Sequence, residues 1–239
     1  MISNVALRQL AHKYQTTELN VRREYIQHLF LSYFYQQPQS DEIYFKGGTA
    51  LRVLYDSPRF SEDLDFSSSL TSLHPIEQAV LETLAGIERE NISPELHESK
   101  RTSGGYLAIL TFQMQTDMIS LQLVVSLREG RKKGEPVTVV SSYIPAFTVI
   151  ALTREQLVEE KVNALLTRQK ARDFYDLYFI LRANLLPAKE RRVLPQVLRT
   201  LQRSQIDFEK ELKQFLPKSD WALIRTFRTT LERELERYV

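Results

Sequence analysis

The sequence predicts an α+β fold in which a small mixed sheet is flanked by helices and followed by a C-terminal helical bundle. Three observations support this prediction. Apolar residues recur at helical spacing near the N-terminus, β-rich runs occupy the middle of the chain, and the pattern from Thr153 onward is helical. We therefore expect a core with an N-terminal helical pair over residues 1–152 and a helical domain over residues 153–239.

In the first domain, short helices and strands are expected to alternate. The spacing of apolar residues predicts helices over residues 5–11, 21–34, 49–55 and 75–91. Enrichment in β-branched and aromatic residues predicts strands over residues 42–45, 64–66, 106–115, 118–127, 137–140 and 147–152. Gln115-Thr116-Asp117 joins two of these strands in the manner of a hairpin.

The second domain is expected to begin with a capped helix. Thr153-x-x-Gln156 fits a capping box, and the helix after it runs to about residue 170. Further helices are expected to start near residues 173, 195, 206 and 220. The last one carries an apolar stripe, which favours a packed core face over a cofactor site: Trp221, Ile224, Phe227, Leu231 and Leu235.

Composition excludes several classes of function. The chain has 239 residues, a formal net charge of +2 and no cysteine, so disulfides, thiolate metal sites and cysteine nucleophiles are absent. Its four histidines are scattered, which favours surface or packing roles. No apolar run has the length of a membrane span and the N-terminus lacks a signal-peptide pattern, so we expect a cytoplasmic protein with no membrane partner.

A glycine-rich turn precedes the helix expected over residues 49–55. Its sequence is Lys46-Gly47-Gly48-Thr49. Backbone N–H groups at a helix start bind phosphate, Gly48 removes side-chain bulk, Thr49 adds a hydroxyl donor and Lys46 adds a counter-charge. The spacing is not that of a Walker A loop, and a turn of this kind alone often serves only tight geometry.

Two carboxylates follow this turn. Asp63 and Asp65 are two apart, so on a strand they face the same side, and their repulsion is on the order of 2 kcal/mol. A bound Mg²⁺ or Mn²⁺ would turn that repulsion into a ligand set. The alternative is a solvated acidic turn in which Ser61-Glu62-Asp63 caps a helix. The preceding glycine turn favours the metal site.

A third group of charged residues lies in the second domain. Lys161 and Arg168 share one helix face, as either a phosphate-facing stripe or a solvated basic edge. Arg172 and Asp176 are four apart and suited to an ion pair. Asp173 is suited to a helix N-cap.

Together these motifs resemble the AbiEii/AbiGii family of nucleotidyltransferase toxins, which belong to bacterial toxin–antitoxin and abortive-infection systems. The resemblance covers roughly residues 21–180. It rests on Lys46-Gly47-Gly48-Thr49-Ala50-Leu51, Arg59-Phe60-Ser61-Glu62-Asp63-Leu64-Asp65-Phe66, Glu160-Lys161-x-x-Ala164-Leu165 and Arg172-Asp173-x-x-Asp176-Leu177.

The resemblance implies a DNA-polymerase-β-like nucleotidyltransferase core that uses an NTP and Mg²⁺ (or Mn²⁺). It implies transfer of a nucleotide to an RNA acceptor, such as the tRNA 3′ end, and a cognate antitoxin. The implied catalytic residues are Asp63 and Asp65, which also bind the metal, with Lys161 and Asp176. The implied nucleotide-binding residues are Lys46, Gly47, Gly48 and Thr49, to which the basic stripe adds Arg168.

The chain departs from the family at one position. In this fold a third carboxylate comes from a neighbouring strand, where this sequence places Val124. Loss of a general base costs roughly 10²–10⁴ in rate. Asp117 and Glu129 are the candidate substitutes.

An RNA-binding surface is only weakly indicated. A loop with Arg128, Arg131, Lys132 and Lys133 is either an RNA contact or a solvated hairpin end. The C-terminal helices carry more Lys and Arg than acids, which allows an RNA-facing surface without requiring one.

Three hypotheses follow. The first is a Mg²⁺-dependent nucleotidyltransferase toxin that modifies RNA and is restrained by an antitoxin. The second, motivated by Val124, is a nucleotide-binding but catalytically weak module that acts through a protein partner. The third uses the same site for phosphoryl transfer to protein.

Overall fold

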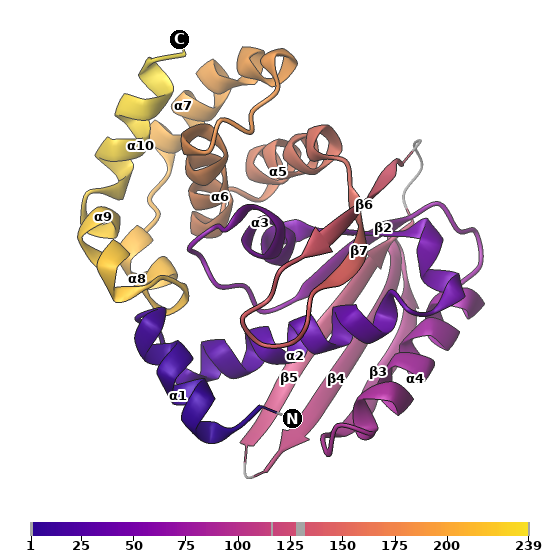
Figure 1. Cartoon of the computed structure of the whole chain (residues 1–239). Helices are drawn as coiled ribbons and strands as arrows, with labels where there is room; N and C mark the ends of the chain where they lie inside the picture. Colours follow the sequence, from indigo (N-terminus) through magenta and orange to yellow (C-terminus); the bar gives the residue numbers. More distant parts are fainter. Residues whose placement is uncertain (1, 116, 128–131, 239) are drawn as a thin grey trace. The chain divides into compact units, whose positions relative to one another are not determined.

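The computed structural model describes residues 2–115, 117–127 and 132–238, which form two compact units (Figure 1). The first, called here the sheet unit, contains Met1–Asp56 and Phe60–Thr153. The second, the helical unit, contains Arg154–Val239 together with the loop segment Ser57–Arg59. The chain passes from one unit to the other after Thr153, one residue beyond the expected boundary at Leu152.

The described strands of the sheet unit form one seven-stranded mixed sheet in the order β3-β4-β5-β2-β1-β7-β6 (Figure 1). Their bounds are β1 Ile43–Lys46, β2 Leu64–Ser68, β3 Ser93–Thr102, β4 Gly105–Met114, β5 Asp117–Ser126, β6 Gly134–Val139 and β7 Phe147–Leu152. β1 is antiparallel to β2 and parallel to β7, and β2 is parallel to β5. The predicted α+β class is confirmed.

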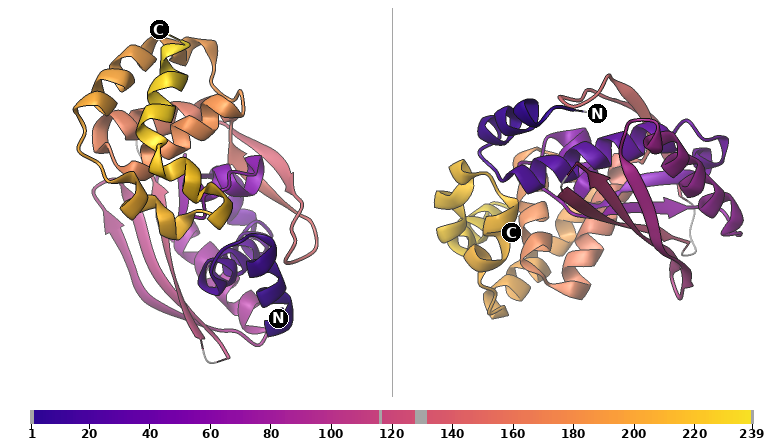
Figure 2. Two further views of the ribbon diagram at one scale, coloured as in Figure 1. Left: turned by 90° about the vertical axis from the view of Figure 1, so that its left-hand side faces the viewer. Right: turned by 90° about the horizontal axis from the view of Figure 1, so that it is seen from below.

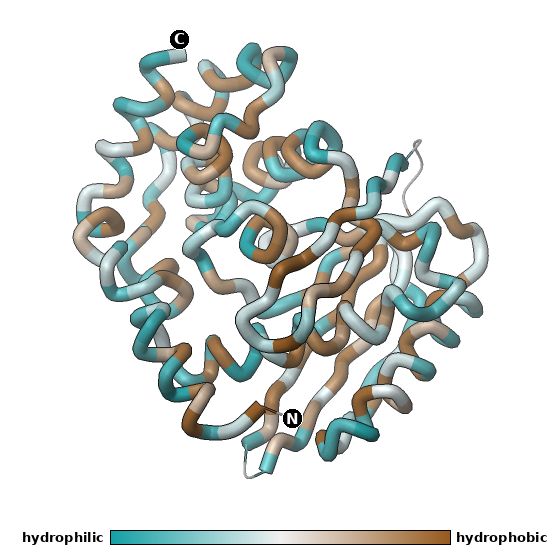
Figure 3. The backbone as a smooth tube through the Cα atoms, in the orientation of Figure 1, coloured by the Kyte–Doolittle hydropathy of each residue, from teal (hydrophilic) through white to brown (hydrophobic). Residues whose placement is uncertain are grey.

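One face of the sheet is covered by helices of the same unit. These helices are α1 Asn4–Lys13, α2 Glu18–Phe34, η1 Pro38–Glu42, α3 Gly47–Tyr55 and α4 His74–Glu88. α2 and α4 pack against each other, and the ring of Phe34 in α2 lies 5.3 Å from that of Phe66 in β2. Along β5, Leu121, Leu123 and Val125 are buried, whereas the alternate residues are not. Figure 3 shows apolar residues concentrated along these central strands.

β3 was not predicted. It is an edge strand, paired only with β4 in the described sheet, and its sequence SPELHESKRT is mostly exposed. Charged residues and a proline on an edge strand prevent unwanted pairing with other chains, and they also remove the apolar alternation by which strands are recognised.

Aromatic side chains form part of the core of the helical unit, whose helices are drawn in Figure 2. Its elements are α5 Arg154–Arg168, α6 Ala171–Arg182, η2 Ala188–Val193, α7 Leu194–Arg203, α8 Phe208–Leu212, η3 Lys213–Phe215, η4 Lys218–Asp220, α9 Trp221–Arg225 and α10 Phe227–Glu236. Phe208 packs against Phe174 and Phe227, with ring centroids 5.9 and 4.9 Å apart.

The single helix expected after residue 220 is in fact two, α9 and α10, which meet at Thr226. The predicted apolar stripe is otherwise a core face, because Ile224, Phe227, Leu231 and Leu235 are buried. No helix in the described ranges combines the length and apolar character needed to cross a bilayer.

Candidate active site

The turn between β1 and α3 brings the glycine pair against an aspartate. Gly47 has φ +87, a left-handed conformation that favours glycine. A Cβ atom there would lie 2.3 Å from Oδ2 of Asp65. Only glycine therefore fits at this position, and the start of α3 lies directly against the Asp65 carboxylate. α3 begins without a side-chain cap from Lys46, which leaves its first N–H groups facing the turn.

Asp65 lies in the middle of a row of residues across the sheet. It pairs with Lys46 on β1 and with Val124 on β5. Paired residues on neighbouring strands face the same side, so these three side chains share one face of the sheet. Asp65 is half-buried, and no hydrogen bond or ion pair joins its carboxylate to the residues that the structure describes.

Thr49 fixes the backbone at Asp63. The side chain is 1% exposed, and its hydroxyl donates to the carbonyl oxygen of Asp63 at 2.5 Å. The hydroxyl therefore has an internal partner. Its effect is to hold the segment before β2 against α3, which sets the position of both aspartates.

These two aspartates fit a divalent cation. Carboxylate oxygens are the ligands that Mg²⁺ prefers, and Mg²⁺ typically takes one or two of them while retaining waters and substrate phosphate oxygens. The half-buried Asp65 carboxylate, with no partner among the described side chains, is a group for which a cation would compensate. Asp63 and Asp65 are the residues that would hold the metal.

The third carboxylate is absent from the position next to Asp65. The β2–β5 register places Val124 there, as expected from the family resemblance. Asp117 does not replace it, because it lies seven residues earlier on β5, about 23 Å away at strand spacing, on the opposite face. It also pairs with Arg22 at 3.3 Å. Glu129 lies outside the described residues, which contain no group of three acidic or histidine side chains suited to a metal.

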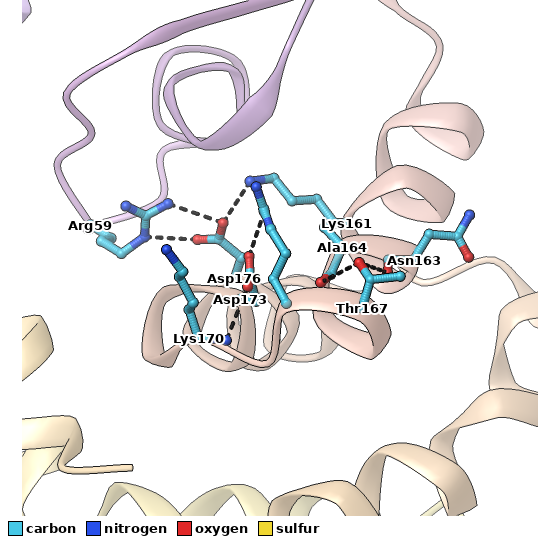
Figure 4. A network of polar contacts seen from close by, with 9 residues as sticks. Arg59, Lys161, Asn163, Ala164, Thr167, Lys170, Asp173 and Asp176 are labelled. Atoms are coloured by element: carbon cyan, nitrogen blue, oxygen red, sulfur yellow. Dashed lines mark hydrogen bonds and ion pairs between the residues drawn. The ribbon is translucent and has the colours of Figure 1, made fainter. Parts of the chain in front are cut away.

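In the helical unit, Asp176 is the centre of a buried ion-pair network (Figure 4). Arg59 donates from Nε to Oδ1 at 2.8 Å and from Nη2 to Oδ2 at 3.0 Å. Lys161 donates from Nζ to Oδ2 at 2.7 Å. The Asp176 side chain is 2% exposed and that of Arg59 is 4% exposed. Two cations therefore share one carboxylate away from water.

This environment sets the charge of Asp176 and its role. Burial alone would raise the pKa of the carboxyl, but the charges and hydrogen bonds of Arg59 and Lys161 outweigh it and lower the pKa to about 2. Because both carboxylate oxygens are occupied, Asp176 is not placed to bind a metal directly. It positions Lys161, whose ammonium group retains two further N–H donors. Its partners are Arg59 and Lys161, not the neighbouring Arg172 suggested by the sequence.

Arg168 and Asp173 form a second pair. Arg168 Nη2 donates to Oδ1 of Asp173 at 2.7 Å, while Oδ2 accepts from the backbone N–H of Lys170 at 3.2 Å. Asp173 is thus the third residue of α6 and bonds back to its start, rather than acting as the N-cap. Arg168 is 48% exposed, so part of its guanidinium faces solvent.

Sequence reasoning gave Arg59 no role, although it lies in the same motif as the aspartates, Arg59-Phe60-Ser61-Glu62-Asp63-Leu64-Asp65-Phe66. Its partner Asp176 is 117 positions away in sequence, so no local spacing could have paired them. Of the basic loop, Arg128 and Arg131 lie outside the described residues.

Comparison with known proteins agrees with this geometry. The family model described as nucleotidyl transferase AbiEii toxin, type IV TA system, matches residues 29–237. No curated protein matches the chain. MenT4, a nucleotidyltransferase toxin from Mycobacterium tuberculosis H37Rv, has a similar structure, with a TM-score of 0.68, 16% identity, and coverage of 100% of this chain and 93% of that one.

Two structures from Helicobacter pylori are also similar. A proposed nucleotidyltransferase has a TM-score of 0.60 and 19% identity, covering 93% of this chain and 99% of that one. JHP933 has a TM-score of 0.54 and 19% identity, covering 93% and 95%. At these identities the structural likeness establishes the fold.

Proposed function

Because the chain belongs to the AbiEii family of nucleotidyltransferase toxins of type IV toxin–antitoxin systems, we propose that it transfers a nucleotide from an NTP to an RNA acceptor. The proposed acceptor is the 3′ end of tRNA, and the proposed cofactor is Mg²⁺. The reaction takes place in the cytoplasm, where a cognate antitoxin restrains it.

The observation that carries this proposal is the packing of the Asp65 carboxylate against Gly47. It combines a metal-binding group with a helix start that offers backbone N–H groups, which is the pairing that a metal-bound triphosphate requires. Asp63 would share the cation, and Lys46 would offset phosphate charge from the end of β1. The bound cation supplies charge neutralisation and alignment of the reacting oxygens.

The reaction is a displacement at the α-phosphorus of the NTP. An RNA hydroxyl oxygen forms a bond to that phosphorus, the bond to the bridging oxygen breaks, and pyrophosphate leaves with the electron pair of that bond. The hydroxyl proton passes to solvent water. Lys161, held by Asp176, is proposed to contact the phosphates through its remaining N–H donors, with Arg168 as a second cation. Arg59 and Asp176 act by positioning Lys161.

The test is nucleotide incorporation. Purified protein is incubated with each α-labelled NTP, Mg²⁺ and total tRNA, alongside Asp63→Asn, Asp65→Asn and Lys161→Met variants. We expect label in tRNA only with the unchanged protein. Label retained by Asp65→Asn would contradict the proposed site, and α-label that enters protein instead of RNA would support nucleotidyl transfer to protein. A parallel reaction with γ-labelled NTP reports phosphoryl transfer to protein.

A second candidate function is favoured by Val124, which replaces a carboxylate beside Asp65. It is a nucleotide-binding module of low catalytic activity that acts through a protein partner. Tight binding of an NTP, measured by calorimetry, together with no incorporation for any of the four NTPs, would favour it.

A further inference from the structure

The helix α7 carries its charge on one side. Leu194, Val197 and Leu201 are buried against the rest of the helical unit. At 3.6 residues per turn, Gln196, Arg199 and Arg203 fall within about 60° of one another on the opposite side. All three are exposed. Arg192 lies in η2, four residues before Gln196, is also exposed and extends this line of residues. We call the line the arginine stripe: Arg192, Gln196, Arg199 and Arg203.

The stripe is not balanced by acidic residues. The segment 191–206 contains four arginines and no aspartate or glutamate. Some exposed cations elsewhere in the helical unit lie beside carboxylates, as Lys189 does with Glu159 at 3.0 Å. Within the described residues, no ion pair joins Arg192, Arg199 or Arg203 to a carboxylate. Three guanidinium groups on one side of the helix are therefore available to an anionic ligand.

The stripe is also held rigidly. Arg228 of α10 donates from Nη1 to the carbonyl oxygen of Leu201 at 2.5 Å and from Nη2 to that of Ser204 at 3.0 Å. These bonds tie the C-terminal end of α7 to α10. A helix fixed at its C-terminal end presents Arg199 and Arg203 in a set geometry, which lowers the entropy cost of binding.

We propose that the arginine stripe binds the sugar–phosphate backbone of the polynucleotide acceptor. The inference rests on the proposed function for the existence of that acceptor. Guanidinium groups suit phosphate because their N–H donors match its oxygens, and a glutamine among them donates to sugar or phosphate oxygens. The stripe contains no apolar side chain, whereas the buried centre of a protein–protein interface is rich in apolar and aromatic residues. This favours a nucleic-acid backbone over an acidic protein.

The experiment compares two triple variants with the same charge change. In the first, Arg192→Gln, Arg199→Gln and Arg203→Gln remove the stripe, and glutamine keeps the helix propensity of arginine. The matched control removes three cations of the same unit that already pair with glutamates, by Arg154→Gln, Lys213→Gln and Arg237→Gln. A third variant replaces the stripe arginines by lysine and keeps the charge.

Binding of a fluorescein-labelled tRNA transcript is measured by anisotropy at several KCl concentrations without NTP. Each lost phosphate contact reduces the slope of log K against log salt by about 0.7 to 0.9, so the stripe variant is expected to lose about 2 units of slope. Its affinity near 0.1 M salt should fall by roughly tenfold to a hundredfold. The matched control and the lysine variant should keep most of the salt slope and most of the affinity.

Nucleotide transfer supplies the second readout. In the stripe variant, KM for full-length tRNA should be higher than in the unchanged protein. Both kcat and the KM for a short oligonucleotide of the tRNA 3′ end should be unchanged. An unchanged salt slope in the stripe variant, or an equal loss of slope in the matched control, would overturn the proposal. The first result is also the one expected if the stripe binds an acidic protein, such as an antitoxin, instead of RNA. Failure of the proposed function would give a different result. The unchanged protein would then incorporate no nucleotide, whereas the difference in tRNA binding between the stripe variant and the matched control could still be measured.

Discussion

Asp65 and Val124 lie opposite each other on the parallel strands β2 and β5, with their side chains on the same face of the sheet. Neighbouring strands are about 4.8 Å apart, so a carboxylate at Val124 would be close enough to share a cation with Asp65. This pair therefore decides how many acidic ligands the candidate active site offers.

Replacing Val124 by aspartate should strengthen the site. We expect Val124→Asp to increase the rate of nucleotide incorporation in Mg²⁺ by at least tenfold, up to the roughly 10²–10⁴ that a general base contributes. Without Mg²⁺ the same variant should be less stable, because two carboxylates then face each other. Val124→Asn is the control for size and polarity. A folded Val124→Asp protein with no gain over Val124→Asn would show that no third carboxylate is needed there.

Gly47→Ala should abolish activity. The added Cβ would lie 2.3 Å from Asp65 Oδ2 and would require a positive φ, so the turn and the carboxylate must both move. The comparison is Gly86→Ala in α4, where the Cβ would lie 2.6 Å from the Tyr33 ring, away from the aspartates. Both variants should lower the urea midpoint, but only Gly47→Ala should eliminate incorporation. Loss of activity in Gly86→Ala at permissive temperature would contradict this assignment.

Thr49→Val should lower stability and activity together. The hydroxyl is buried and donates to the Asp63 carbonyl, so replacing it removes that hydrogen bond at a cost of about 1 kcal/mol. Thr49→Ser retains the hydroxyl and should recover most of the loss. The measurements are urea unfolding and the Mg²⁺ concentration that gives half-maximal incorporation. That concentration should rise in Thr49→Val, since Asp63 is no longer fixed.

Asp176→Asn should be strongly destabilising. It leaves the buried Arg59 and the nearly buried Lys161 without their carboxylate, and breaking a buried ion pair costs about 3–5 kcal/mol. Asp173→Asn is a matched change in the same helix. Its partner Arg168 is half exposed, so the loss of free energy of unfolding should be smaller. Equal losses in the two variants would argue against the network as a special source of stability.

The lowered pKa of Asp176 also predicts that the free energy of unfolding falls at acid pH. Since its pKa is about 2 in the folded protein against an ordinary 3.8, its stabilising contribution is complete above 3.8 and is lost as the pH falls through 2.

Because of His28, the free energy of unfolding should also depend on pH above the range in which carboxylates titrate. Burial lowers its pKa to about 4, whereas the nearby charge of Glu24 opposes this shift. The unfolded chain binds a proton near pH 6.5 that the folded protein does not, so stability falls as the pH drops from 6.5 toward 4. At pH 5 the loss is about 2 kcal/mol. His28→Phe should flatten urea midpoints between pH 7 and pH 5, and an unchanged slope would contradict this reading.

Local pattern predicted most of the fold. Strands β4 and β5 follow directly from apolar alternation, because each buries one side against the core, whereas α2 is buried around most of its circumference. β3 could not be recognised, since an edge strand is shaped by the need to avoid pairing and not by burial. The break at Thr226 was missed because the apolar spacing continues through it.

The site was predicted in part. The glycine turn and the aspartates are close in sequence, and their proximity follows from one strand–helix–strand segment. The bond that occupies the Thr49 hydroxyl and the pairing of Arg59 with Asp176 depend on tertiary packing, which no spacing rule encodes.

The position of β1 in the sheet has a consequence for synthesis of the chain. β1 ends at Lys46, yet its parallel neighbour β7 begins only at Phe147, roughly a hundred residues later. At translation rates of about 5–20 residues per second, the ribosome needs about 5–20 s to supply that neighbour. Until then the strand that leads into the glycine turn has an open edge, so its sheet pairing is completed only after most of the chain has been made.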